Sequence, residues 1–524
     1  MSVISVVPHV EIKIDGIELS SEIVQTIQTI QVKQILSAPS QCEIQIPEAH
    51  QQFLTEVHTK VGGLIQIKIE NYDKPLFYGQ ITAVDLVYDA SVSPLVLIRA
   101  YDLLHQLRKR QPIRTHVQVN MFQLAEDLTQ DLGIKIQGGE TTPRTSRLFQ
   151  FKQSDLHLLH EFGEKYGHYF FLNENSLQIT SLEGIRVNES LTLGENLLEA
   201  RFSINAETTT TSVVATGWDM QRTTPHMSTA QESDIEVNNE IRIKPGDFAT
   251  DGQRTLVDHN VQNENQAELI AQKELDRHKV QQITLWGVAE GNPVLTPGAS
   301  ILISGVATVL EGRYVLTEVT HTIDPVKGFI SEIKTNPPII EKTNYNKNST
   351  IGIVSQVDDP DSLARVKVTL PTYNDIETEW LEVILPGAGS NKGQLILPDV
   401  GDNVLLLMIN GEPAQSVVLG GLFGEKDLPT PSVIEGGSVK RYVTQTAGEQ
   451  RIFLDDAEVS INIETQTGHN ICLKPESISI THDNGSFMTI ADNNMSIHSE
   501  TNLEIEAPGR SIVFRGRKID FEEA

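Results

Sequence analysis

The chain has 524 residues, a length that suits about three domains of ordinary size. Its composition, 39% hydrophobic and 21% charged, is typical of a globular protein and excludes wholesale disorder. The formal net charge of −29 opposes binding to phosphate backbones and anionic lipid surfaces, so we expect no nucleic-acid partner.

The cysteine content and the first residues indicate where the chain is made. Cys42 and Cys472 lie far apart in the sequence and supply no disulfide framework. The first residues, MSVISVVPHVEIKIDG, lack the basic start and cleavage motif of a signal peptide, and no segment reaches the apolar length of a membrane span. We therefore expect synthesis in the cytoplasm, with any export following a route that needs no signal peptide.

Residues 1–335 are predicted to form a mixed β and α region. Residues 121–133 have apolar side chains at helical spacing and end on a glycine. The run SDLHLLHEFGEKYG begins with Ser154 as a candidate N-cap, and residues 263–281 form a third candidate helix. Alternating segments such as LIQIKIE and SLQITS predict strands between these helices.

An internal echo links the two ends of this region. Residues 81–100 (ITAVDLVYDASVSPLVLIRA) resemble residues 316–335 (LTEVTHTIDPVKGFISEIKT), and each segment reads as a strand, a turn and a second strand. Glycine-led strands, GLIQIKI and GASILIS, precede them. Two readings stay open: a pair of ordinary hairpins, or two related barrels in one chain.

Two linkers enclose a small all-β segment. Residues 336–350 form a linker rich in Asn, Pro and Lys, and residues 425–440 form a second one rich in Pro and Gly. Between them, residues 351–424 contain about five short strands separated by Gly, Pro and Asp turns. This pattern predicts a closed barrel of the oligonucleotide/oligosaccharide-binding (OB) type.

Residues 441–524 carry a short repeat. Two apolar residues separated by one residue form a pair, and such pairs recur with a mean period of about eight residues, with turn formers such as HDNG and APG between them. Each pair predicts a short strand with one buried face. The pairs are Ile452/Leu454, Ile461/Ile463, Ile471/Leu473, Ile478/Ile480, Met488/Ile490, Met495/Ile497, Leu503/Ile505, Ile512/Phe514 and Ile519/Phe521.

So small a unit cannot bury its own apolar side chains, so copies of it must stack. Three chains wound around one axis would bury all of the paired residues as the core of a thin needle. A single-chain solenoid obeys the same periodicity, so periodicity alone leaves the number of chains open.

Two runs of the sequence resemble the VgrG spike proteins and the hub–needle proteins of contractile phage tails. One is FQFKQSDLHLLHEFGEKYGHYFFLNENSLQI, and the other begins GIVSQVDDPDSLARVKV and continues into WLEVILPGAGSNKGQLILPDVGDNVLLLMINGEPAQSVVLGGLF. Ala364 stands where the family usually has glycine. The resemblance covers essentially the whole chain. It implies a mainly β fold with an α+β N-terminal part, in which two related phage-hub-like barrels are followed by an OB-type barrel and a trimeric, intertwined β-helix or β-prism needle.

The same resemblance implies a function. The homotrimer would be the central spike of a contractile injection machine, adapting a hexameric inner tube protein to a threefold needle that punctures the target cell envelope mechanically. Its partners would be baseplate proteins, a PAAR-repeat tip protein and effector cargo. Because the chain is short and no domain follows the needle, we favour an extracellular, phage-tail-like particle over the type VI secretion apparatus.

The needle's end and its histidines lead to two further expectations. Arg515, Arg517, Lys518 and Phe521 are candidates for docking the tip protein, although they could also be outward-facing residues that aid solubility. Phage needles that sharpen themselves bind iron through a His-x-His motif. Here His469, His482 and His498 are isolated in sequence, so we expect no metal and no other cofactor in this chain.

Signals for catalysis are weak. HEFGEKYGH starts like a zinc-protease helix, but Glu164 stands where the second histidine is required. Adjacent Asp455 and Asp456 read as a solvated turn, because neighbouring strand residues face opposite sides. The basic run at residues 105–116 reads as a solvated helix end or as a contact with an acidic tube or baseplate surface.

We therefore predict that the protein is not an enzyme. The alternative function is a trimeric β-helical tailspike enzyme or receptor-binding protein acting on cell-surface polysaccharide. A tailspike enzyme would need long turns carrying a carboxylate groove, whereas the turns here are only a few residues long.

Overall fold

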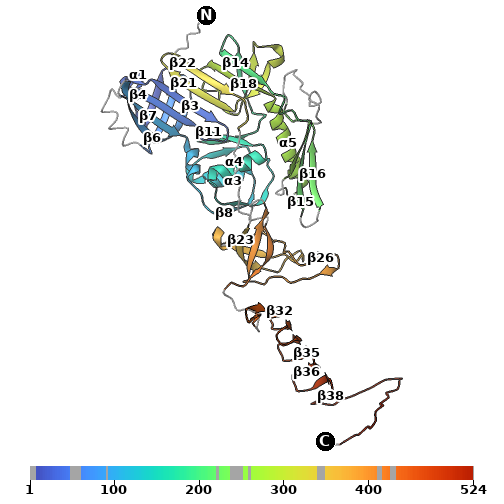
Figure 1. The fold of residues 1–524 in the computed structure, drawn as a ribbon. Coiled ribbons are helices and arrows are strands. Elements are labelled where there is room, and N and C mark those ends of the chain that lie inside the picture. Colours follow the sequence, from blue (N-terminus) through green and yellow to red (C-terminus); the bar gives the residue numbers. More distant parts are fainter. Residues whose placement is uncertain are drawn as a thin grey trace. The chain divides into compact units, whose positions relative to one another are not determined.

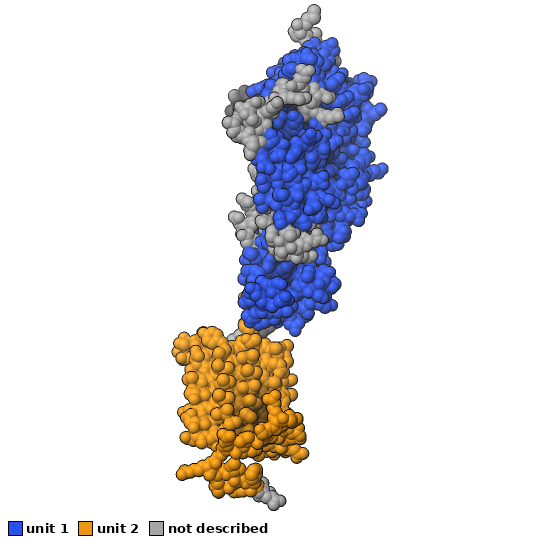
Figure 2. Space-filling model, turned by 90° about the vertical axis from the view of Figure 1, so that its right-hand side faces the viewer, with its two compact units in different colours: residues 1–421 blue, residues 422–524 orange. Residues whose placement is uncertain are grey.

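The computed structural model describes most of the chain, and its contacts divide it into an N-terminal unit, residues 1–421, and a C-terminal unit, residues 422–524 (Figure 2). Within the described residues, no helix is both long enough and apolar enough to cross a membrane. The described ranges are 7–47, 61–89, 92–219, 224–235, 252–257, 261, 263–338, 349–409, 416–424 and 432–522.

One antiparallel sheet of eleven strands organises the first part of the N-terminal unit (Figure 1). The pairing of β21 with β3, which joins Glu318 to Ile35, connects its two halves. In spatial order the strands are β14 (Leu197–Ile204), β18 (Ile283–Glu290), β22 (Gly328–Lys334), β21 (Glu318–Asp324), β3 (Thr29–Ile35), β4 (Gln41–Pro47), β7 (Val92–Tyr101), β6 (Phe77–Asp89), β5 (Leu64–Ile69), β1 (Val10–Ile14) and β2 (Ile17–Glu18).

Two hydrophobic cores pack against this sheet, and β21 contributes to both, with Ile323 in one and Val319 in the other. Ile12, Ile44 and Ile65 belong to one core, and Leu285 and Ile301 belong to the other. The two echo segments form hairpins, β6–β7 and β21–β22, one in each half. The strands that precede them differ, because β5 pairs with β6 whereas β19 (Ala299–Ser304) pairs with β13 (Ile185–Thr192) and β20 (Gly312–Val315) in a separate sheet. The likeness is therefore strongest in the hairpins.

An α/β segment lies between the two halves in sequence. The predicted helices at residues 121–133 and at SDLHLLHEFGEKYG are confirmed, and the Oγ atom of Ser154 accepts a hydrogen bond from the backbone N–H of His157 at 3.2 Å, as an N-cap should. The elements are η1 (Leu103–Arg108), β8 (Arg114–Val119), α3 (Met121–Thr129), η2 (Gln130–Leu132), β9 (Lys135–Gln137), β10 (Thr145–Gln150), α4 (Asp155–Lys165), β11 (Tyr169–Asn173) and β12 (Ser176–Thr180).

The third predicted helix is also confirmed, as α5 (Glu264–Gln281). It contributes Ala267, Ala271 and Leu275 to a core shared with the small sheet β16-β15-β17. The strands of that sheet are β15 (Ser212–Asp219), β16 (Thr224–Ala230) and β17 (Gln253–Val257); three other short elements are α1 (Ser21–Thr26), η4 (Thr308–Leu310) and η5 (Pro371–Tyr373).

The predicted barrel segment forms a five-stranded sheet. Val366, Val368 and Leu406 fill its core, and Phe149 and Phe151 from the α/β segment pack into the same core. The order is β25 (Ile376–Glu377), β24 (Lys367–Leu370), β23 (Ser349–Gln356), β28 (Asn403–Met408) and β29 (Ser416–Leu422), with a separate hairpin of β26 (Ala388–Gly389) and β27 (Lys392–Gly393). The prediction of a mainly β fold with an α+β N-terminal part is confirmed.

The C-terminal unit is a meander of seven antiparallel strands that follows a short hairpin (Figure 1). Every strand of the meander pairs with its neighbours in sequence. The hairpin is β30 (Ile434–Glu435) with β31 (Ser438–Val439); the meander is β32 (Arg441–Gln445), β33 (Arg451–Asp455), β34 (Ser460–Glu464), β35 (Asn470–Lys474), β36 (Ser477–Thr481), β37 (Phe487–Ala491) and β38 (Asn494–His498).

Candidate functional site

The apolar pairs of the C-terminal unit form two straight columns across the meander. The register places each aliphatic residue opposite another: Ile471, for example, lies between Ile463 and Ile480. We call these residues the aliphatic columns. One column is Leu454, Ile461, Leu473, Ile478, Ile490 and Met495; the other is Ile452, Ile463, Ile471, Ile480, Met488 and Ile497.

The aliphatic columns face solvent in the single chain. Their exposed fractions lie between 37% and 58%, whereas the residues between them, such as Asn462 at 8%, are less exposed. The face predicted to be buried is therefore uncovered in one chain. In most antiparallel sheets the apolar face packs on a core and the polar face meets solvent, so the distribution here is reversed. A contiguous aliphatic surface of this kind marks an interaction site.

The last three predicted pairs differ from the prediction in their secondary structure. They form no strands, because from Leu503 to Phe521 the described residues have no strand partner, and in Figure 1 the chain runs on beyond β38 outside the sheet. They are also not core residues in the single chain. The exposed fractions are 59% for Leu503, 57% for Ile505, 44% for Ile512, 64% for Phe514, 50% for Ile519 and 92% for Phe521.

The physical reason for this disagreement is the missing neighbour. Ile505 and Phe514 were predicted to point into a needle core. In the single chain their backbone pairs with no strand, so they belong to no sheet and both side chains are exposed. In the single chain, Ile505, Phe514 and the other residues of these pairs therefore form no strands. Six of the nine predicted pairs do lie in strands, and burial of any pair in an assembled needle stays a prediction.

An ion-pair network fixes the first strands of the meander. Asp455 accepts a hydrogen bond from Nε of Arg441 at 2.7 Å, and Arg441 also contacts Glu435 at 2.9 Å. The bond from Arg441 holds the pKa of Asp455 below its usual range. The interpretation of Asp455 as part of a solvated turn was wrong: it is a buried strand residue, and its Oδ1 accepts the backbone N–H groups of Ala457 and Glu458.

Among the described residues, the histidines of α4 belong to no group of three potential metal ligands. Glu164 pairs with Arg277 of α5 at 2.9 Å, and His160 stands edge-on to Phe170. Burial lowers the pKa of His160 to about 4. Across the described ranges, the one group of three potential metal ligands is His469, His482 and Asp483 in the meander. His469 and His482 are therefore neighbours in space although they are separated in sequence.

Two arginines of the basic run at residues 105–116 form ion pairs within the α/β segment. Neither the solvated helix end nor the contact with an acidic surface considered from the sequence includes this structural role. Arg114 donates to Oδ1 of Asp155 at 2.8 Å, and Asp155 at the start of α4 is completely buried. Arg110 makes two hydrogen bonds to Asp131, at 3.0 and 2.7 Å. A buried aspartate needs a charged partner, so Arg114 stabilises the α/β segment through Asp155, and nothing in the sequence spacing could have paired the two residues.

One hollow of the N-terminal unit has a volume of about 570 Å³ and includes Asp102 in its lining. Burial raises the pKa of Asp102 to about 7. Its two carboxylate oxygens accept the backbone N–H groups of Ser40 at 2.7 Å and Leu104 at 3.1 Å. The carboxylate of Asp102 therefore connects the start of η1 to the loop before β4, and its role is structural.

The residues proposed to dock a tip protein are all exposed. Arg515, Arg517 and Phe521 lie in the segment without strand partners, and Lys518 pairs with Asp520 at 2.6 Å. Their docking role stays a prediction.

The chain resembles solved structures of injection machines. It has the fold of the E. coli c3393 protein, a component of the type VI secretion system described as similar to the T4 tail proteins gp27 and gp5 (TM-score 0.52, 13% identity, 78% of this chain and 99% of that chain). It also matches the lidded Francisella PdpA–VgrG complex (TM-score 0.54, 8% identity, 94% of this chain and 80% of that chain). At such identities the likeness shows the fold, which is that of a VgrG-like spike protein.

Two family models match the sequence itself. The type VI secretion system/phage-baseplate injector OB domain matches residues 350–423, which contain the five-stranded sheet. The Alg8 N-terminal domain matches residues 5–325, more than half of the chain, so the chain belongs to this family. Among curated proteins, none matches the chain.

Proposed function

We propose that three copies of this chain form the central spike of a contractile injection machine. The observation that carries the proposal is the pair of aliphatic columns, which the single chain leaves facing solvent. Each strand has five residues, so each sheet is only about 17 Å wide. Two such narrow sheets placed face to face would leave the sides of their core open, whereas three sheets around one axis close it.

The segment beyond β38 supports the same arrangement. Its backbone has no strand partner in its own chain, although it repeats the apolar spacing of the meander at Leu503/Ile505, Ile512/Phe514 and Ile519/Phe521. Strands from the other two chains would supply both the missing hydrogen bonds and the missing apolar contacts. In this proposal the meander forms one face of a prism, and the last pairs intertwine.

The spike acts mechanically in this proposal. The N-terminal unit adapts a hexameric inner tube and the baseplate to threefold symmetry, and the C-terminal unit is driven through the target envelope with a PAAR-repeat protein at its tip and effector cargo attached. In this proposal the protein catalyses no reaction, is made in the bacterial cytoplasm and becomes part of an extracellular, phage-tail-like particle. The fold of the VgrG-like relatives supports the spike role.

The mass of the purified chain in solution tests the assembly. Light scattering coupled to size-exclusion chromatography should give three times the chain mass of 58.1 kDa. A stable complex with a PAAR-repeat protein encoded beside this chain should then form, and removal of residues 503–522 should abolish it. A monomer that cleaves surface glycans would contradict the proposal and favour the tailspike alternative.

A further inference from the structure

Two successive turns on one edge of the meander bring His469 and His482 together. His469 ends the turn between β34 and β35, and His482 begins the turn between β36 and β37. The last pair of the β35–β36 ladder is Asn470 with Thr481, so the two histidines are the next residues on either strand. Directly opposed strand residues have Cβ atoms about 5 Å apart, and here the ring centroids are 4.3 Å apart.

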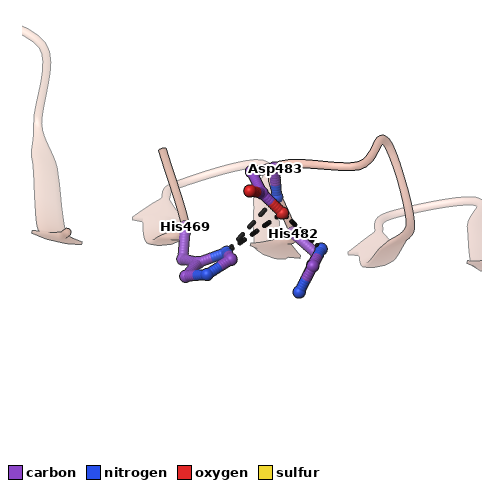
Figure 3. Close-up of side chains that lie close together, drawn as sticks. All are labelled: His469, His482 and Asp483. Carbon is purple, nitrogen blue, oxygen red and sulfur yellow. Dashed lines mark hydrogen bonds and ion pairs between the residues drawn. The ribbon is translucent and has the colours of Figure 1, made fainter. Parts of the chain in front are cut away.

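The second turn adds a carboxylate to the two imidazoles. Oδ1 of Asp483 lies 2.7 Å from Nδ1 of His482 and 3.8 Å from Nδ1 of His469, and Figure 3 shows the three side chains converging. The turns themselves are in contact: a Cβ atom built on Gly468 would lie 3.8 Å from Cβ of Asp483. The cluster is thus assembled by backbone elements whose register is set by the meander.

The hydrogen bonds around the two imidazoles indicate what kind of ligand the cluster can bind. The backbone N–H of Asp483 donates to Nδ1 of His469 at 3.3 Å, and an Nδ1 atom that accepts a hydrogen bond carries a lone pair and no proton. The backbone N–H of Asn484 donates to Nδ1 of His482 at 3.2 Å, so this Nδ1 also carries a lone pair, and Oδ1 of Asp483 lies 2.7 Å from it. Such a gathering of lone pairs attracts a positive charge, which a metal ion can supply to all three side chains at once.

We propose that His469, His482 and Asp483 form a binding site for a divalent transition metal of the Zn²⁺ class. Two imidazole nitrogens and one carboxylate oxygen, with a fourth position open to water, are a common zinc ligand set, whereas Ca²⁺ and Mg²⁺ prefer oxygen ligands alone. The three ligand atoms already lie within 4.8 Å of one another. Tetrahedral zinc separates its ligand atoms by about 3.4 Å, so the widest separation must close by at most about 1.4 Å, and the 2.7 Å contact between His482 and Asp483 must open by about 0.7 Å.

The expectation of no metal in this chain rested on the absence of a His-x-His motif. The register supplies a different route, because residues thirteen positions apart become neighbours on adjacent strands. A bound ion would join two turns that the backbone connects only through β35 and β36, and so would stiffen this edge of the sheet. All three ligands come from one chain, so the site does not depend on the proposed trimer.

Metal content of the full-length, untagged protein tests the site. After removal of metal with EDTA and dialysis against ZnCl₂, mass spectrometry of the metal should find one Zn²⁺ per chain. The Co²⁺-loaded protein should show the visible absorption of a tetrahedral site. His469→Ala and His482→Ala should each weaken Zn²⁺ binding at least tenfold, and Asp483→Asn should weaken it by a smaller factor.

His498→Ala is the matched control. His498 is also an exposed histidine of the meander, and it contacts a carboxylate, Glu500, at 2.9 Å, yet it lies outside the cluster. This variant should bind Zn²⁺ as the parent does. No stoichiometric metal in the parent protein, or the same metal content in the double variant His469→Ala/His482→Ala, would overturn the proposal. Because metal is counted per chain, this result is separate from the outcome of the mass measurement.

Discussion

At the scale of single residues, Ala364 has an unfavourable backbone conformation. Its φ is +59°, in the left-handed region where a Cβ atom costs about 1–2 kcal/mol. The loop around it is held by Asp359, whose carboxylate accepts Nε and Nη2 of Arg365 at 2.9 and 2.7 Å and the backbone N–H of Leu363. The loop therefore keeps its shape although residue 364 is strained.

Replacing Ala364 with glycine should stabilise the five-stranded sheet. Relief of the left-handed strain outweighs the extra chain entropy of glycine, for a net gain of about 0.5–1 kcal/mol. Amide hydrogen exchange in β23 and β24 should slow by a factor of about two to five. Ala388→Gly is the control, since Ala388 is exposed and has no positive φ; it should bring no protection. Faster exchange in the Ala364→Gly protein would contradict this account.

At the scale of elements, the aliphatic columns depend on the uniform length of the strands, five residues each, and on the register that the turns set between them. A shift of one residue in any turn would send a pair to the opposite face of the sheet. The opposite face carries residues such as Cys472, Ser479 and Thr489 in register with one another. One face of the meander is thus aliphatic and the other carries small and polar residues. One substitution on each face can test which of them forms the interface.

Ile480→Asp and Ser479→Asp make that comparison. Ile480 belongs to an aliphatic column, so in a trimer its replacement buries three unpaired carboxylates at several kcal/mol each, and the assembly should dissociate to monomers. Ser479 lies on the other face, so Ser479→Asp should leave the trimer intact. Light scattering at equal protein concentrations measures both. Equal behaviour of the two variants would show that the columns are not the interface.

Some of this architecture could be predicted from the sequence. The apolar spacing located six of the meander strands, and helical spacing with Ser154 as N-cap located α4, because these signals are local. The last three pairs, which include Ile505 and Phe514, form no strand here, because a strand needs a hydrogen-bonding partner and the chain provides none for them. Apolar spacing predicts which residues share a face, but it does not predict what covers that face.

Other features depend on contacts between residues distant in sequence. The pairing of Arg114 with Asp155 spans two elements, and the meeting of His469 with His482 follows from the register of β35 and β36. A motif search at fixed spacing finds neither. The signal that could have found the histidine pair was the repeat itself, since it places both residues at the ends of successive strands.

At the scale of the whole molecule, sensitivity to acid is concentrated in the N-terminal unit. Burial lowers the pKa values of His105, His160 and His321 to about 4 each. Because the folded pKa of each lies below the unfolded value of about 6.5, their stabilising contribution is complete above that pH and is lost as the pH falls toward 4. Burial also lowers the pKa values of His116 and His168. Burial raises the pKa of Asp102 to about 7 and raises that of Glu161, which has the opposite effect, but these carboxyl groups are outnumbered by the histidines.

We therefore expect the N-terminal unit to weaken between pH 6.5 and 4 while the meander does not. Hydrogen exchange at pH 7 and pH 5, corrected for intrinsic rates, should show faster relative exchange in β21 and α4 and an unchanged value in β35. His321→Gln should reduce the effect, because it removes one buried titrating group whose ring contacts Ser331 and the Leu295 carbonyl. Equal acid sensitivity of the two units would refute this expectation.

The position of the aliphatic columns along the chain has a consequence for biosynthesis. The ribosome makes residues 1–421 before it reaches the meander, which takes roughly 20 to 85 s at about 5–20 residues per second. Mixed and β-rich domains fold in milliseconds to seconds. The aliphatic columns, which are proposed to bind other copies, therefore leave the exit tunnel only after the preceding unit has folded. Nascent chains then associate through their C-terminal units alone.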